Sequence, residues 1–208
     1  MAGLDYENEF RRLGKNIVVG IDEAGRGPLA GPLVVACAVL PPSYDNPEIN
    51  DSKKLTEKKR EELFTLIKEV ALDYSIMVVS VEEIDASNIY RVTQQAMEKI
   101  TSNLKIKYDA ILTDAMPLPN CKVPYKSIIK GDSLSQNIAA ASILAKVTRD
   151  HIMYELDKQY PMYNLKKNKG YGTKEHISAI HEHGFTSIHR KTYEPIKSML
   201  NEQLSLPI

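Results

Sequence analysis

Two adjacent acids, Asp22 and Glu23, come directly after the apolar residues 17–21 and directly before a turn in which an arginine lies between two glycines. The β-branched apolar residues predict a buried strand, and ligand sites collect at the carboxyl ends of such strands. Glycine lets the backbone of the turn, residues 24–28, adopt positive φ and approach a ligand, and arginine offers planar donors to a phosphate. These residue types in this order predict a metal-bound phosphodiester site.

Two further acids stand near the ends of predicted strands. Asp114 ends the apolar residues 110–113, and Asp132 follows residues 128–131 just before a long predicted helix. Each alone has an ordinary alternative, a turn or N-cap aspartate, because an aspartate before a helix accepts from free N–H groups. Four carboxylates that converge repel one another unless a cation is present, and hard oxygen ligands select Mg²⁺ or Mn²⁺.

A pair of such ions, about 4 Å apart, activates a water and stabilises in-line phosphodiester hydrolysis, so no Cys, His or Ser nucleophile is required. One geometric difficulty concerns the two adjacent acids, because neighbouring side chains on a regular strand point to opposite faces. Asp22 and Glu23 therefore both face the ions only if the chain bends there, and we expect residues 24–25 to supply the bend.

Strand and helix patterns alternate along the chain. Strands are predicted at residues 17–22, 32–40, 72–81, 109–114 and 124–130. Helices are predicted from a cap at Thr56, from Ser87 or Asn88 to 103, from 134 or 135 to 159, at 174–183 and at 194–203, with a loop at 160–172. The first two strands are joined by too few residues for a crossover helix and should be antiparallel, whereas later strands can be parallel. The pattern predicts an α/β fold, a mixed five-stranded sheet flanked by helices, with a helical C-terminal extension.

Composition limits the class of protein. The 208 residues, 43% of them hydrophobic, are enough for one domain spanning residues 1–208 and argue against a disordered or fibrous chain. Cys37 and Cys121 have no metal-binding spacing and are expected to be free thiols in a reducing cytoplasm. The charged residues 1–12 lack the apolar region of a signal peptide, and no run of roughly 18 apolar residues occurs, so we expect neither secretion nor membrane insertion.

The net charge is zero, so the charge of the whole chain does not predict a nucleic-acid partner. The distribution is more informative, because residues 146–191 carry nine Lys and Arg against five acids, together with all five histidines. A second basic cluster comprises Lys53, Lys54, Lys58, Lys59 and Arg60. Any single cluster is more often a solvated surface, but two clusters beside an acidic centre favour a groove for a phosphate backbone.

The chain also contains a series of short blocks in a fixed order. They are GIDEAGRGPLAGP at residues 20–32, DSKKL at 51–55, TDA at 113–115, KGD at 130–132, AASILAKVTRD at 140–150, GYGT at 170–173, His176, and HR at 189–190. Together these blocks resemble the ribonuclease HII family, the prokaryotic type 2 ribonucleases H. The resemblance runs from about residue 16 to residue 196 and rests on several independent blocks.

This resemblance implies a ribonuclease H-like fold and endonucleolytic cleavage of the RNA strand of RNA–DNA hybrids. It also implies nicking on the 5′ side of a single ribonucleotide embedded in duplex DNA, leaving a 3′-hydroxyl and a 5′-phosphate. By similarity, the catalytic, metal-binding acids are Asp22, Glu23, Asp114 and Asp132, which would hold two Mg²⁺ or Mn²⁺ ions in the substrate complex. The region of about 160–208 would contribute to substrate binding.

The same resemblance assigns substrate contacts. Gly25, Arg26 and Gly27 would contact the ribonucleotide 2′-hydroxyl and the adjoining phosphates, largely through the backbone, and the 2′-hydroxyl is what distinguishes RNA from DNA. Tyr171 matches a tyrosine that stacks on the sugar of the following deoxynucleotide; a tyrosine that merely packs its loop is the alternative.

Other positions carry over less directly. Lys53, Lys54, Lys146 and Arg149 resemble positions that contact phosphates or support the site, although Arg149 could instead pair with Asp150. For His176 and His189 we expect capping or packing rather than catalysis.

The expected partners are an RNA–DNA hybrid and a DNA duplex that contains ribonucleotides, with the protein acting as a cytoplasmic monomer. The tail at residues 203–208, QLSLPI, has the glutamine and apolar character of a sliding-clamp peptide, against the alternative of a frayed terminus. Two other functions remain open from the residues alone: an inactive nucleic-acid-binding relative, in which one of the four acids should be replaced, and a phosphatase or transposase-like nuclease that shares the fold.

Overall fold

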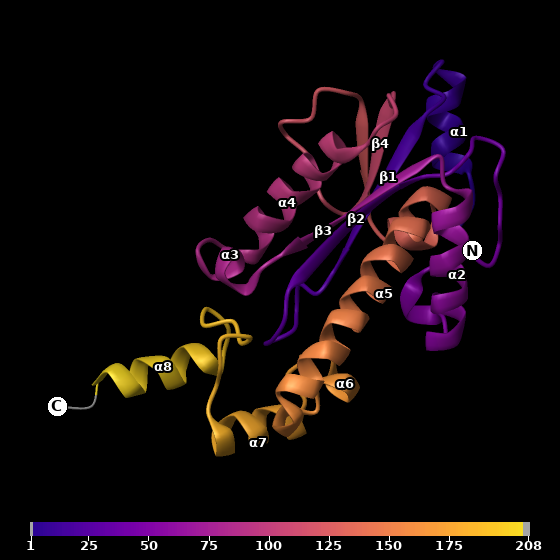
Figure 1. Ribbon diagram of the computed structural model, residues 1–208. Helices are drawn as coiled ribbons and strands as arrows, with labels where there is room; N and C mark the ends of the chain where they lie inside the picture. The colour runs from indigo at the N-terminus through magenta and orange to yellow at the C-terminus, as the bar shows by residue number, and fades with distance from the viewer. Residues whose placement is uncertain (1, 206–208) are drawn as a thin grey trace.

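Five strands form one mixed sheet at the centre of the computed structural model, which describes residues 2–205 and side chains up to residue 201 (Figure 1). The sheet order is β3-β2-β1-β4-β5. The bounds are β1 (Val18–Ala24), β2 (Leu33–Val39), β3 (Asp73–Val79), β4 (Ala110–Asp114) and β5 (Tyr125–Ile128). β1 pairs antiparallel with β2 and parallel with β4, which confirms the predicted mixed sheet.

Helices cover both faces of this sheet. On one face lie α5 (Gln136–Gln159) and α2 (Glu57–Val70), and on the other lie α4 (Ile89–Ile100) and the short α3 (Val81–Asp85). Alternate residues of β2 supply the two cores, because successive side chains of a strand point to opposite faces.

The contact between β1 and α5 depends on one glycine. A Cβ built on Gly20 would lie 2.1 Å from the carbonyl carbon of Asn137, so only glycine lets the helix lie this close to the strand. Asn137 strengthens the contact, because its Nδ2 donates to the carbonyl of Val18 at 2.8 Å. This contact places the start of α5 over the end of the sheet that carries the acids.

Side chains that cap the N-terminus determine where several helices begin. Thr56 and Asn88 cap α2 and α4 as predicted. Ser135 caps α5 by accepting from the N–H of Ile138, so the alternative that Asp132 is the N-cap is wrong. The predicted strand at 72–81 ends at residue 79, because Ser80 forms a capping box that starts α3.

The N-terminal helix α1 (Asp5–Arg12) was not predicted. It is fastened to the start of α5 by the buried Glu7, whose carboxylate accepts from the Ser135 hydroxyl at 2.6 Å and the Asn137 N–H at 3.0 Å. Four short 3₁₀ turns occupy Ser52–Lys54, Thr101–Asn103, Gly131–Ser133 and Pro161–Tyr163.

The C-terminal region contains α6 (Leu165–Asn168), α7 (Lys174–His183) and α8 (Ile196–Ser205). The 3₁₀ turn at Pro161–Tyr163 and α6 lie in the stretch that was predicted to be a loop. A separate apolar cluster, which includes Met153 of α5 together with Tyr163 and Ile180, joins this region to the end of α5. The turn at Pro161–Tyr163, α6 and α7 are therefore packed onto the end of α5, whereas α8 projects away from it (Figure 1).

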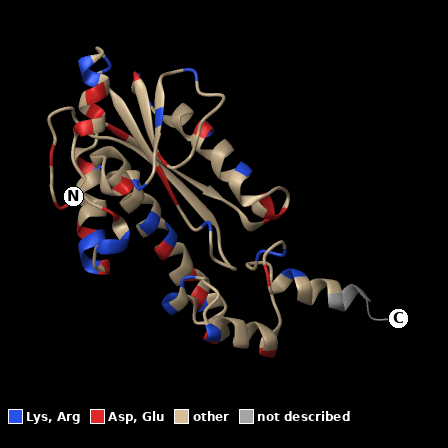
Figure 2. Cartoon of the chain, turned by 180° about the vertical axis from the view of Figure 1, so that it is seen from behind, with Lys and Arg blue, Asp and Glu red and all other residues tan. Residues whose placement is uncertain are grey.

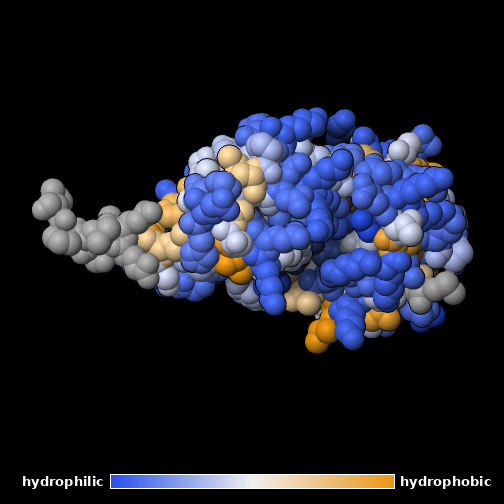
Figure 3. Space-filling model, turned by 90° about the horizontal axis from the view of Figure 1, so that it is seen from below, coloured by the Kyte–Doolittle hydropathy of each residue, from blue (hydrophilic) through white to orange (hydrophobic). Residues whose placement is uncertain are grey.

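Charge and polarity are spread over the surface. Lysine and arginine are dense on α2, and both signs of charge occur on α5 and on the C-terminal helices (Figure 2). The face seen in Figure 3 is largely hydrophilic with scattered apolar patches. No helix in the part of the chain that the structure describes has both the length and the apolar character needed to cross a bilayer. The proposed clamp peptide extends over residues 206–208, which lie outside the described residues.

Candidate active site

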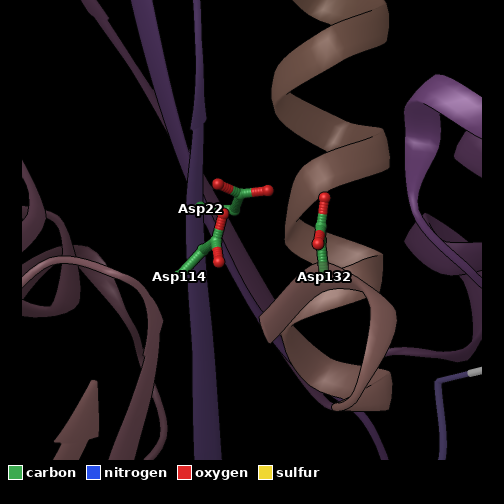
Figure 4. Close-up of side chains that lie close together, drawn as sticks. All are labelled: Asp22, Asp114 and Asp132. Atoms are coloured by element: carbon green, nitrogen blue, oxygen red, sulfur yellow. The ribbon is translucent and has the colours of Figure 1, made fainter. Parts of the chain in front are cut away.

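Three aspartates meet at one edge of the sheet (Figure 4). Asp22 lies on β1, Asp114 ends β4, and Asp132 lies in the turn Gly131–Ser133 after β5. Each offers a carboxylate oxygen, and these oxygens all lie within 4.8 Å of one another. Asp22 and Asp114 meet because β1 and β4 are parallel neighbours, so their carboxyl ends share an edge. Asp114 Oδ1 also accepts from the N–H of Gly131 at 2.8 Å, which fixes the turn that carries Asp132.

The protein environment disfavours charge on Asp22 and on Asp132. Burial raises the pKa of Asp22 well above its usual range, and the nearby carboxylates of Glu23 and Asp114 raise it further. The pKa of Asp132 is also raised, mainly by burial and then by Asp114 and Asp51. Three converging carboxylates with few internal donors are a suitable ligand set for a hard divalent cation, which would remove the repulsion.

Glu23 does not join the three aspartate oxygens. β1 remains regular through Ala24, with Asp22 opposite Ala36 and Glu23 opposite Val35, so the bend expected at residues 24–25 falls after both acids. The Glu23 carboxylate lies 3.6 Å from the Arg26 guanidinium, and its other oxygen, Oε2, is buried with no hydrogen-bond partner in the described structure. Glu23 is therefore next to the cluster and retains one free ligand atom.

Burial also changes the proton affinity of Glu23. Desolvation, opposed by Arg26 and reinforced by Asp114, raises the pKa of Glu23 from 4.5 to about 7. The unfolded chain releases this proton at lower pH than the folded chain. The stability associated with a neutral Glu23 is therefore complete below pH 4.5 and is lost as the pH rises to about 7.

We expect Glu23→Gln to stabilise the metal-free protein at pH 8 by about 1–3 kcal/mol, because the amide removes a charge that the folded state disfavours. At pH 4 the variant and the original protein should unfold alike. Thermal unfolding in EDTA at the two pH values measures this, with the exposed Glu69→Gln as control. Equal stability of Glu23→Gln and the original protein at pH 8 would contradict the raised pKa.

A pocket of about 270 Å³ opens beside the acids. It is lined by most of the residues predicted to contact substrate or support the site, namely Gly25, Arg26, Gly27, Lys53, Lys146, Arg149 and Tyr171, together with the predicted metal ligand Glu23 and with Ser52 and Ser142. Lys54 lies outside this pocket. It lines a neighbouring pocket of about 370 Å³ with Asp114 and Asp132. The two serines were not assigned a role from sequence; their hydroxyl oxygens are 2.8 Å apart and join the turn Ser52–Lys54 to α5.

The lysines differ in their surroundings. Lys53 Nζ lies 3.9 Å from Asp132, and the pKa of Lys53 is raised because the carboxylates of Asp132 and Asp22 outweigh the effect of burial. Lys146 is paired with Asp150 at 2.7 Å. Lys54 is mostly exposed and lies 3.6 Å from Asp51.

Two buried arginines hold backbone carbonyls beside the pocket, and one of them, Arg190, holds the turn at residues 25–27. Arg190 donates to the carbonyls of Gly25 at 2.6 Å and Arg26 at 3.0 Å, and also to that of Gly31. Arg149 donates to the carbonyls at residues 30, 32 and 169.

The alternative that Arg149 pairs with Asp150 is wrong, because Asp150 instead pairs with Lys146 and Arg60. A role for Arg190 was not predicted; its only signal in the sequence is its place in the HR block at residues 189–190.

Tyr171 lies close to the turn at residues 25–27 and lines the same pocket. It lies between Gly170, with φ +81°, and Gly172, and its ring atom Cε1 is 3.6 Å from the position of a Cβ on Gly27. The residue is 49% exposed, so its ring is available to a ligand rather than packed within its own loop. The predicted packing of His176 and His189 agrees with their complete burial.

The mixed sheet is that of a ribonuclease H-like fold, and its three converging aspartates could hold a divalent cation. A sequence profile described as Ribonuclease HII matches residues 19–195. A ribonuclease HII from Desulfitobacterium hafniense is 53% identical over 184 residues, which cover 88% of this chain and 71% of that protein. The chain therefore belongs to the ribonuclease HII family of type 2 ribonucleases H, hydrolases that act on RNA–DNA hybrids.

Solved structures agree with the family assignment. The ribonuclease H2 from Pyrococcus horikoshii OT3 superposes with a TM-score of 0.78 at 27% identity, covering 91% of this chain and 100% of that one. A PCNA:RNase HII complex from Archaeoglobus fulgidus gives a TM-score of 0.70 at 26% identity. The match covers 86% of this chain and 95% of that one. These matches decide against a phosphatase or a transposase-like nuclease.

Proposed function

We propose that the chain nicks duplex DNA on the 5′ side of a single embedded ribonucleotide, in addition to cutting the RNA strand of hybrids. The products are a 3′-hydroxyl and a 5′-phosphate. The observation that supports this most strongly is the single pocket in which the turn at residues 25–27 faces Tyr171, with Glu23 on its wall and the three aspartates beside it.

The turn recognises the ribose. Arg190 already donates hydrogen bonds to the carbonyls of Gly25 and Arg26. The N–H groups of the turn and the Arg26 guanidinium therefore contact the 2′-oxygen and the adjoining phosphates. A side chain at Gly27 would reduce the space in front of Tyr171. The aromatic ring then stacks on the sugar of the next deoxynucleotide and reads the junction.

The acids hold two divalent cations, Mg²⁺ or Mn²⁺, when substrate is bound. Asp22, Asp114 and Asp132 supply one group of oxygens, and Glu23 supplies its unpaired Oε2. Such ions supply Lewis-acid activation of the attacking water and neutralise charge on the phosphate. The parallel neighbours β1 and β4 position Asp22 and Asp114, and the hydrogen bond from the Gly131 N–H to Asp114 positions the turn that carries Asp132.

The lysines guide the phosphate backbone. Lys53 and Lys146 stand at the first pocket and Lys54 at the second, so a strand that passes from one to the other meets all three. Each contact with a phosphate releases counterions, so binding should weaken as salt rises. We further propose that the protein acts as a monomer in a reducing cytoplasm.

A clamp contact is also proposed. The relative from Archaeoglobus fulgidus was solved as a PCNA:RNase HII complex, and the tail at residues 203–208 of this chain has a glutamine followed by apolar residues. A peptide of these six residues should bind a sliding clamp in a pull-down, and a scrambled peptide should not.

The nick position tests the proposed activity. Three end-labelled duplexes are compared with Mg²⁺ or Mn²⁺: all-DNA, DNA with one ribonucleotide, and an RNA–DNA hybrid. We expect a single nick 5′ of the ribonucleotide and none in all-DNA. Tyr171→Ala should slow this nick about 10-fold or more, since one base or sugar stack contributes about 1–3 kcal/mol, and Tyr171→Phe should retain it. Equal cleavage of all three duplexes would show a general nuclease instead.

A further inference from the structure

Two fully buried histidines lie directly beneath the loop that carries Tyr171. His176 is on α7, and its Nδ1 lies 2.9 Å from the carbonyl oxygen of Tyr171. Its other nitrogen, Nε2, lies 3.2 Å from Nε2 of His189. The Nδ1 of His189 in turn lies 3.1 Å from the backbone N–H of Thr186. The two rings therefore form a continuous chain between a backbone donor and a backbone acceptor.

The chemistry of the two ends fixes every proton in this chain. A carbonyl oxygen only accepts, so His176 Nδ1 carries a hydrogen and donates to Tyr171. The backbone N–H of Thr186 only donates, so His189 Nδ1 carries no hydrogen. In the neutral rings His176 Nε2 is then bare and His189 Nε2 is protonated, and the contact between them is a hydrogen bond from His189 to His176. The two histidines must be opposite tautomers.

A charged ring would break this arrangement. A proton on His176 Nε2 would face the N–H of His189 across the 3.2 Å contact, and a proton on His189 Nδ1 would face the backbone N–H of Thr186. Burial lowers the pKa of both rings, and for His189 the pKa falls to about 4 with His176 as the second cause. The ring of Tyr163 packs edge-on against the ring of His189, and the centroids of these two rings are 4.7 Å apart. The rings are therefore held neutral.

This chain of hydrogen bonds links two parts of the pocket that are proposed to face substrate, namely Tyr171 and the turn at residues 25–27. His189 forms an isolated bridge with Ala30, and the N–H of Gly31 donates to the Ile188 carbonyl at 2.8 Å. The next residue, Arg190, holds the carbonyls of the turn at residues 25–27. The segment 188–190 is thus bonded to the turn on one side and, through the histidines, to Tyr171 on the other.

We propose that His176 and His189 are positioning residues that set the place of Tyr171 relative to the turn at residues 25–27, and so determine how well the protein prefers a ribonucleotide–deoxyribonucleotide junction. Neither touches substrate. The inference rests on the proposed junction-reading role of Tyr171 and extends it from the pocket surface to the buried chain beneath.

The tautomers are tested without any activity measurement. In a long-range ¹H–¹⁵N correlation spectrum of the original protein at pH 7.5, His176 should show a protonated Nδ1 and His189 a protonated Nε2. His176→Asn and His189→Gln spectra assign the signals. Two histidines with the same tautomer, or a charged ring at this pH, would contradict the proposed chain of hydrogen bonds.

The effect on recognition is tested by the junction preference, the ratio of kcat/KM for a single-ribonucleotide duplex to kcat/KM for a long hybrid. His176→Phe keeps an aromatic ring but removes the donor to Tyr171, and it should lower the ratio about 3- to 10-fold, the value of one lost hydrogen bond. His176→Asn keeps a donor near the Nδ1 position and should retain the ratio. The exposed His181→Phe on the same helix is the matched control and should change nothing.

Comparison with Tyr171→Ala separates the junction-reading role of Tyr171 from the positioning role of the two histidines. If Tyr171→Ala lowers the ratio and His176→Phe does not, the positioning role is wrong while junction reading stands. If Tyr171→Ala leaves the ratio unchanged, the proposed junction reading fails and the positioning role fails with it. A fall in hybrid cleavage equal to the fall in junction cleavage for His176→Phe would indicate general damage and also overturn the inference.

Discussion

Asp22→Asn is expected to abolish cleavage and, at the same time, to make the metal-free protein more stable. Loss of one carboxylate from the cluster should reduce kcat by about 10³-fold or more, comparable with the removal of a single group that stabilises transition-state charge. Stability should rise because Asp22 is buried beside Asp114 and Glu23, and these neighbours raise its pKa. Neutralising it removes that repulsion.

The sign of the stability effect depends on pH and metal. Because the pKa of Asp22 is raised on folding, its neutral form adds stability that is complete in acid and is lost as the pH rises. The gain for Asp22→Asn should therefore be larger at pH 8 than at pH 4, and divalent cation should reverse it by stabilising only the original protein. Thermal unfolding with EDTA or Mn²⁺ measures this, with the exposed Asp45→Asn as control. A variant that is less stable than the original protein in EDTA would contradict the mutual repulsion of the acids.

Gly25→Ala is expected to have the largest effect on the substrate pocket. Gly25 has φ +104°, and a Cβ there would lie 2.2 Å from Nε of Arg149 and 2.7 Å from the carbonyl oxygen of Pro32. Arg149 is fixed by three backbone carbonyls and has no room to move aside. Strain and overpacking together should cost about 2–4 kcal/mol of unfolding free energy.

Gly27→Ala is the matched control for this prediction. Gly27 has no positive φ, and the nearest atom to its added Cβ is a Tyr171 ring carbon at 3.6 Å, an ordinary contact. Urea unfolding should show a loss for Gly25→Ala and nearly unchanged stability for Gly27→Ala. Cleavage at a single ribonucleotide should fall in both variants, because both place a methyl group in the pocket. Equal stability of the two variants would contradict the account of the turn.

The sheet was predictable because its strands carry strong local patterns. β2 is apolar throughout and β4 is apolar over residues 110–112, and both strands end within one residue of their predicted bounds. β1 extends two residues past its prediction, because Asp22 and Glu23 are polar and yet pair with Ala36 and Val35 of β2. Pairing partners distant in sequence, which a local pattern does not include, determine where this strand ends.

Other features depend on contacts that no local pattern contains. α1 is short and charged, and its place is decided by Glu7, whose partners Ser135 and Asn137 lie more than 120 residues away. The role of Arg190 likewise depends on carbonyls about 160 residues away.

The position of the acids after apolar runs was enough to expect that they converge, but not to tell which of the two adjacent acids stands apart. The structure brings Asp22, Asp114 and Asp132 together and leaves Glu23 beside Arg26, because β1 does not bend between its two acids. Backbone geometry, rather than residue type, decides which of two adjacent acids joins the cluster.

The most direct test of the central claim is a crystal structure of Asp132→Asn with Mn²⁺ and a duplex that contains one ribonucleotide, with the ions located by anomalous scattering. We predict manganese bound to Asp22 and Asp114 with Glu23 alongside, and the ribose 2′-hydroxyl against the turn at residues 25–27 with Tyr171 on the following sugar. Manganese bound away from these carboxylates, or a 2′-hydroxyl that points away from the turn, would contradict the account.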